Sequence, residues 1–181
     1  MDNRKSIFIL VSQTGTILSR IIRILTKDDY NHASIALDNT LEEMYSFGRK
    51  HPYNPVWGGF VRESTKSGTF KRFRETRIIL IQIDVSSNIF DEVNKKLEQM
   101  YSFKGDYRYN YIGLIGALFN KSYKKERCYY CSEFVKEVLV NYNIASSKEF
   151  KKIVKPVNFL KLNKSKIVFE GYMKEYIPAS S

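Results

Sequence analysis

The chain has 181 residues, of which 43% are hydrophobic and 14% aromatic, and its formal net charge is +11. This length supports a single domain over residues 1–181, and no segment has the low hydrophobicity of a disordered tail. No run approaches the roughly 20 apolar residues that span a bilayer, and the apolar run after Lys5 is too short for a secretory signal. We therefore expect a cytoplasmic protein whose cysteines are free thiols.

The positive charge is compatible with nucleic acid, an anionic membrane surface or an acidic substrate as partner. However, the basic residues are spread over separate segments, such as KRFRETR at 71–77 and KEFKK at 148–152. This distribution is typical of a solvated lysine-rich surface, and no nucleic-acid-binding motif accompanies it. The sequence thus disfavours nucleic acid and leaves a peripheral membrane contact open.

The first half of the chain predicts short strands and one helix. Residues 6–13 form an apolar run typical of a buried strand, and 14–27 have apolar residues at helical spacing. Residues 31–38 and 42–49 predict two strands joined by the turn-like DNT. Residues 50–70 contain two prolines, three glycines and the only tryptophan, and they predict a long irregular loop.

The second half predicts two further strands and four helices. Their order, with strands and helices partly segregated, indicates an α+β fold in which an antiparallel sheet packs against helices. The helix at 109–120 is apolar throughout and is expected to be mostly buried. The strands are expected at 77–85 and 166–173, and the helices at 86–103, 109–120, 131–143 and from Pro156 onward.

Both cysteines lie in the segment ERCYYCSEFVKEVL, residues 126–139. The spacing of Cys128 and Cys131 would suit a zinc clip, but His32 and His51 are the only other soft ligands and neither belongs to a paired motif. A redox pair of this spacing would follow the first strand of a βαβ unit. We therefore expect no metal and no cofactor.

Cys131 falls in the first turn of the predicted helix, on the same face as its apolar positions. At that place the helix dipole favours a thiolate, and the first amides could stabilise an oxyanion. Cys128 lies a turn upstream, before the helix begins, and is outside the influence of the helix dipole. The sequence leaves open whether Cys131 is a nucleophile or a small buried hydrophobic residue.

A thiol nucleophile requires a base, and histidine is the usual one. His51 precedes Pro52 and is expected to be solvated. His32 opens a strand on which Ser34 and Ala36 share its face, so small neighbours leave room for a helix end or a substrate. A histidine satisfied within the core is the alternative.

The motif YNHASIALD, followed about a hundred residues later by YYCSEFVKEVL, resembles the circularly permuted branch of the NlpC-type papain-like thiol hydrolases. Relatives of lecithin:retinol acyltransferase and small bacterial predicted cysteine peptidases belong to this branch. The resemblance covers most of the chain and implies a permuted papain-like fold. It also implies a Cys–His dyad, oriented by a third polar group, that attacks amide, ester or thioester carbonyls. Cys131 and His32 match its nucleophile and base.

The resemblance places the third polar group on the strand after the histidine. Ser46, 14 positions after His32, fits that offset best. Glu43 is the charged alternative, although strand alternation places it on the opposite face from Ser46. A serine can orient an imidazole but stabilises an imidazolium less than a carboxylate does.

Two functions follow from the sequence. The first is a cysteine hydrolase or acyltransferase acting on a peptide, amide or acyl-lipid substrate. The loop at 50–70, with residues 57–60, would cover the substrate, and YRYNY at 107–111 would line its groove. The second is a non-enzymatic binding module with a basic surface for nucleic acid or an anionic membrane. For both segments an ordinary structural role is the alternative. The oligomeric state stays open.

Overall fold

The structure is a computed structural model that describes residues 4–13, 29–51, 54–119 and 121–179. Its centre is a six-stranded sheet with the order β4-β3-β2-β1-β5-β8, in which all neighbouring strands are antiparallel. The helix predicted at 14–27 lies outside the described residues. The strands of this sheet are β1 (Arg4–Gln13), β2 (His32–Ala36), β3 (Met44–His51), β4 (Asn54–Glu63), β5 (Arg77–Ser86) and β8 (Ser165–Tyr172).

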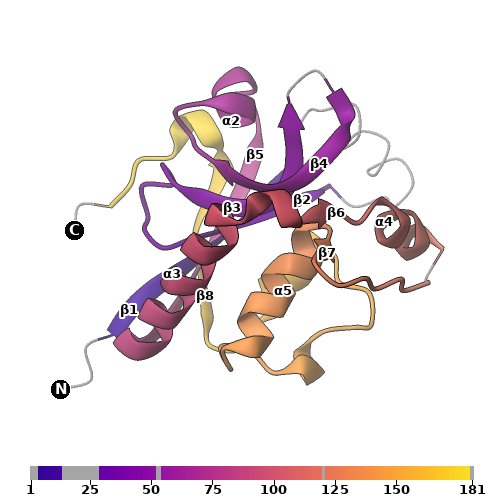
Figure 1. Ribbon diagram of the computed structural model, residues 1–181. Coiled ribbons are helices and arrows are strands. Elements are labelled where there is room, and N and C mark those ends of the chain that lie inside the picture. The colour runs from indigo at the N-terminus through magenta and orange to yellow at the C-terminus, as the bar shows by residue number, and fades with distance from the viewer. Residues whose placement is uncertain (1–3, 14–28, 52–53, 120, 180–181) are drawn as a thin grey trace.

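Helices cover both faces of the sheet (Figure 1). On one face lie α3 and α5, and on the other lies α2 with the segment after β8. A short parallel pair, β6 (Arg108–Tyr109) and β7 (Cys128–Tyr129), precedes α4 and α5 respectively. The α-helices are α2 (Gly68–Arg72), α3 (Ser87–Ser102), α4 (Tyr111–Leu118) and α5 (Cys131–Asn141), and 3₁₀ turns span Lys104–Asp106, Ser147–Glu149, Pro156–Lys161 and Met173–Glu175.

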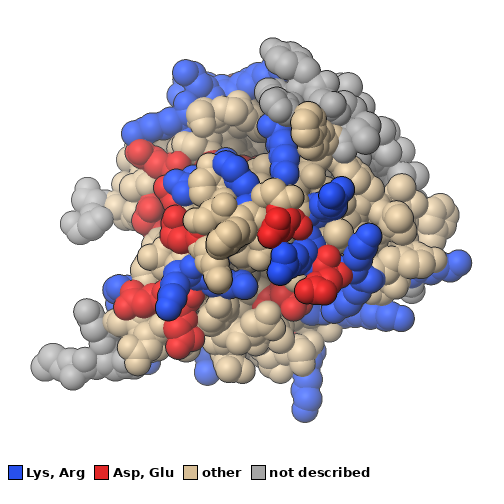
Figure 2. All heavy atoms as spheres, viewed as in Figure 1, with Lys and Arg blue, Asp and Glu red and all other residues tan. Residues whose placement is uncertain are grey.

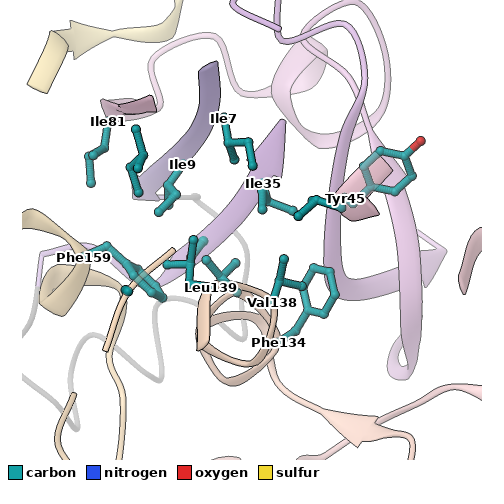
Figure 3. Close-up of a cluster of buried hydrophobic side chains, with 14 of the residues drawn as sticks. Ile7, Ile9, Ile35, Tyr45, Ile81, Phe134, Val138, Leu139 and Phe159 are labelled. Atoms are coloured by element: carbon teal, nitrogen blue, oxygen red, sulfur yellow. The ribbon is translucent and has the colours of Figure 1, made fainter. Parts of the chain in front are cut away.

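The larger core lies between the sheet and α5. Because successive strand residues point to opposite faces, Ile7 and Ile9 of β1 face α5, whereas Phe8 and Leu10 face α2. Figure 3 shows isoleucines of the central strands packed over the apolar stripe of α5. Each such side chain stabilises the fold by about 1.5–3 kcal/mol when fully buried. This packing fixes where the first residue of α5 lies relative to the sheet.

The α+β fold with an antiparallel sheet is confirmed, and most predicted elements are present. The helix predicted at 86–103 is present as α3 and is capped by Ser86, whose hydroxyl accepts a hydrogen bond from the Ile89 amide at 3.4 Å. Among the described residues, no helix is long and apolar enough to cross a membrane.

The prediction of an irregular loop at 50–70 is wrong, because β4 and α2 occupy most of that segment. In the sequence Gly58 and Gly59 suggest a loop, but in the structure they belong to β4 and allow neighbouring segments to pack closely against its backbone. A Cβ added to Gly58 would lie 2.8 Å from the Tyr109 Cβ, and one on Gly59 would lie 2.8 Å from the Tyr107 carbonyl oxygen. These glycines let the segment at 107–111 lie directly on the backbone of β4.

The helix predicted at 109–120 is present as α4, but the expectation that it is mostly buried is wrong. α4 turns Gly113 and Gly116 inward, where Asn110 and Tyr123 cover them, and leaves Ile112 and Ile115 exposed. A Cβ on Gly113 would lie 2.6 Å from the Asn110 Cγ, and one on Gly116 would lie 2.8 Å from the Lys121 carbonyl oxygen. Small residues are therefore needed on the inner face, and the hydrophobic ones point outward.

Candidate active site

Cys131 is the first residue of α5, and its side chain is buried. The thiol lies 4.0 Å from the carbonyl oxygen of Asn31, to which it donates, and is thus beside the residue that precedes His32. The first amides of any α-helix have no partner within the helix. Cys131 therefore lies in the turn of α5 where the free amides and the positive end of the helix dipole are found.

His32 begins β2, and its side chain interacts with both the Cys131 thiol and a carboxylate. The thiol is close enough to raise the pKa of the imidazole. The His32 Nε2 lies 3.0 and 3.1 Å from the two carboxylate oxygens of Glu63. The structure thus brings the predicted nucleophile and the predicted base together.

Glu63, at the end of β4, is the carboxylate partner that the sequence reading missed. β4 carries it to a position opposite Met44 of β3. Besides His32, its carboxylate accepts a hydrogen bond from the Ser34 hydroxyl at 2.6 Å. The side chains of His32 and Glu63 are only 13% and 17% exposed, so their ion pair is largely shielded from water. Three elements therefore contribute to a Cys131–His32–Glu63 arrangement.

Ser46, the residue predicted to orient the histidine, has a different main partner. Its hydroxyl lies 3.4 Å from the His32 Nε2, beyond a good hydrogen bond, but donates to the Ala33 carbonyl at 2.9 Å. Ser46 thus links β3 to β2 beneath the imidazole, while Glu63 makes the shorter contacts.

Glu43, the charged alternative to Ser46, lies away from the imidazole. Its carboxylate accepts a hydrogen bond from the Tyr45 hydroxyl and pairs with Arg62 at 3.0 Å. Strand alternation separates Glu43 from the face that carries Ser46, as the sequence predicted.

The electrostatics of the pair favour a charged imidazole. Burial alone would lower the pKa of His32, but the Glu63 carboxylate and the Cys131 thiol hold that pKa well above its ordinary value. Burial would likewise raise the pKa of Glu63, yet the charge of His32 and hydrogen bonds from His32 and Ser34 lower it. An imidazolium stabilised in this way is the partner that a thiolate nucleophile requires.

Two tyrosines flank the thiol. Burial raises the pKa of both Tyr109 and Tyr130, and the nearby Cys131 raises it further. Both phenols are therefore protonated at neutral pH and able to donate a hydrogen bond. Tyr109 also packs on Tyr111, with ring centroids 4.6 Å apart. The segment at 107–111 thus has one residue, Tyr109, near the thiol.

The segment at 57–60 does not form the predicted substrate cover as a unit. Phe60 is a core residue, and the two glycines pack under neighbouring backbone or side chains. Only Trp57 is exposed. A cavity of about 180 Å³ lies beside Glu63 instead. Its lining includes Arg49, Lys50, Val61, Glu63 and Thr69, but neither His32 nor Cys131.

Cys128 is half-buried in β7 and, like Cys131, is a free thiol. Within the described ranges, no three His, Cys, Asp or Glu side chains are grouped so that they could hold a metal ion. The side chain of His51 lies outside the described part of the structure.

Comparison with protein families, with curated proteins and with solved structures finds no match to this chain. The functional assignment therefore depends on the geometry around Cys131.

Proposed function

We propose that this protein is a cysteine hydrolase or acyltransferase that uses Cys131 as nucleophile, His32 as base and Glu63 as the group that orients the base. The observation that carries the proposal is the position of the Cys131 thiol, 4.0 Å from the carbonyl oxygen of the residue before His32, together with the contacts of the His32 imidazole to the Glu63 carboxylate. Triads of this kind are recognised by geometry and roles rather than by position in the sequence.

In the proposed reaction, the His32 imidazole takes the thiol proton and the thiolate attacks the carbonyl carbon of the substrate. The negative charge that develops on the carbonyl oxygen is stabilised by the first-turn amides of α5. The imidazolium then protonates the leaving amine, alcohol or thiol, and an acyl-enzyme thioester remains. Water or an acceptor, deprotonated by His32, attacks that thioester and restores the thiol.

The proposed fold is the permuted papain-like fold. Support comes from the order of the elements, in which the histidine strand and the carboxylate strand both precede the cysteine helix. Further support comes from the packing of α5 against the central strands (Figure 3). This packing holds the helix start beside the beginning of β2, so that a nucleophile and a base distant in sequence meet.

The proposed substrate contains an amide, ester or thioester carbonyl, in a peptide or an acyl lipid. The cavity beside Glu63 is lined by the side chains of both charged and polar residues, including Arg49, Lys50 and Thr69. It is suited to a polar end of the substrate, whereas the tyrosines at the thiol are suited to the part next to the carbonyl.

A binding module without catalysis receives less support. Its basic surface would need to collect lysines and arginines on one face. On the face seen in Figure 2, basic and acidic side chains are interspersed over much of the surface. Ion pairs such as Lys5–Asp91 and Lys174–Glu75 account for part of this mixing.

Alkylation of the native protein by iodoacetamide tests the triad without knowledge of the substrate. We expect selective labelling of Cys131 near neutral pH, reduced at least tenfold in His32→Ala and in Glu63→Gln. Cys128→Ala is the matched control and should leave the rate of Cys131 unchanged. Equal labelling rates at Cys131 in the wild type and in His32→Ala would contradict the proposal. If the rates differ, acyl esters, thioesters and peptide amides are the substrates to screen.

A further inference from the structure

α4 presents its large apolar residues to solvent along one face. Ile112, Ile115 and Phe119 follow one another at intervals of three and four, and they are 71%, 57% and 73% exposed. Gly113 and Gly116 occupy the inner face. Water-exposed helices normally show the opposite arrangement, with apolar residues turned inward. The outer face of α4 therefore exposes apolar surface at a free-energy cost that a ligand or surface would remove.

Two aromatic side chains on neighbouring segments are also partly exposed. Tyr123, just after α4, is 49% exposed, and Trp57 of β4 is 59% exposed. We call the set of Ile112, Ile115 and Phe119 the apolar ridge.

The segment that contains α4 carries charges of one sign. Between Tyr107 and Lys125 the sequence contains no aspartate or glutamate. In Figure 2, uncharged side chains over α4 are bordered by those of lysine and arginine. The exposed basic residues of this segment are Arg108, Lys121, Lys124 and Lys125.

We propose that the apolar ridge and its basic border form a docking surface for an anionic lipid bilayer. Exposed aromatic and aliphatic side chains on a short helix can enter the headgroup region, while neighbouring lysines contact lipid phosphates. α4 has eight residues and so lies on the bilayer rather than across it. A second copy of the chain is a poorer occupant, since it would bring two basic borders together.

This surface adjoins the candidate active site. Asn110, which caps α4, donates a hydrogen bond to Glu133 of α5 at 3.3 Å, and Tyr109 lies near Cys131. Docking through the ridge would therefore hold the thiol close to the membrane surface. The inference goes beyond the proposed chemistry, because docking requires neither the thiol nor His32.

Co-sedimentation with vesicles tests the proposal. We expect the full chain to bind vesicles of phosphatidylcholine with phosphatidylglycerol at low salt, and to bind pure phosphatidylcholine much more weakly. Ile112→Ser combined with Phe119→Ser should lower the vesicle affinity at least tenfold. Replacing Lys121, Lys124 and Lys125 by Gln should lower it about fivefold for each lysine.

Two control variants change the same kinds of residue elsewhere. Ile177→Ser removes an isoleucine that is 84% exposed, and a triple Lys→Gln variant at the exposed Lys148, Lys151 and Lys152 removes equal charge. Both should bind vesicles as the wild type does, and circular dichroism should show all variants folded. Cys131→Ala should also bind normally, which separates docking from the proposed function.

Three results would overturn the proposal. The first is no binding of the wild type to anionic vesicles at low salt. The second is equal loss of binding in the ridge variants and their controls, which would indicate unspecific attraction. The third is self-association of the wild type that Ile112→Ser with Phe119→Ser abolishes, without vesicle binding, which would make the ridge an interface between protein molecules.

Discussion

α4 and α5 are both rich in apolar residues, yet they bury opposite kinds of side chain. α5 turns Phe134, Val135 and Leu139 into the core against the sheet. α4 turns its glycines inward and its isoleucines outward. α5 is held by its side chains and fixes the position of Cys131, whereas α4 is held by close approach of its backbone and leaves its isoleucines for another surface.

The comparison is tested most directly by shortening one phenylalanine on each helix. Phe134→Ala should lower the free energy of unfolding by about 3–5 kcal/mol, because it removes a fully buried ring. Phe119→Ala should change it by no more than about 0.5 kcal/mol, because that ring is already solvated. Urea denaturation monitored by circular dichroism measures both. A loss above about 2 kcal/mol in Phe119→Ala would mean that the outer face of α4 is packed in solution.

Glu63→Gln tests the electrostatics at the start of β2. His32, whose pKa is raised by folding, stabilises the protein fully below its ordinary value of 6.5 and less as the pH rises through the folded pKa. Glu63, whose pKa is lowered, contributes fully above its ordinary value of 4.5 and less as the pH falls through the folded pKa. The loss of stability in Glu63→Gln relative to the wild type should therefore be largest between pH 4.5 and pH 6.5, where both groups contribute fully. We expect a loss of about 1–3 kcal/mol in the free energy of unfolding there.

Urea denaturation across a pH series gives this difference. The exposed Glu170→Gln on β8 serves as control and should give a difference near zero throughout. A difference between the wild type and Glu63→Gln that does not change with pH would show that the contact with His32 is not an ion pair.

Gly58→Ala tests how α4 is held. An added Cβ would lie 2.8 Å from the Cβ of Tyr109 and 2.7 Å from the hydroxyl oxygen of Tyr111, so the segment before α4 would have to shift. We expect a loss of about 1–3 kcal/mol in the free energy of unfolding, as for overpacking elsewhere. Gly105→Ala, which meets nothing within 4 Å, is the matched control. Equal stability of the two variants would contradict backbone packing at Gly58.

The sequence was sufficient to select Cys131 and His32 as candidates because each belongs to a local pattern. Cys131 begins a clear apolar stripe, and His32 opens a strand with small neighbours. Glu63 was missed because its position depends on a hairpin that pairs it with Met44, while the prolines and glycines before it are usual loop signals. An alternating run ending in a carboxylate, GFVRE at 59–63, was the available signal. The exposure of α4 was missed because hydropathy does not reveal which face must carry small residues.

The smallest expected effect concerns Ser46. Its replacement distinguishes a structural role of this serine from a role in orienting His32. Ser46→Ala removes the donor to the Ala33 carbonyl and should cost about 1 kcal/mol of stability. The labelling rate of Cys131 should stay within about twofold of wild type, because Glu63 continues to hold the imidazole through a charge-assisted contact. If Ser46→Ala instead slowed labelling as much as Glu63→Gln does, the weaker contact at 3.4 Å would be the one that orients His32, and Glu63 would serve the fold alone.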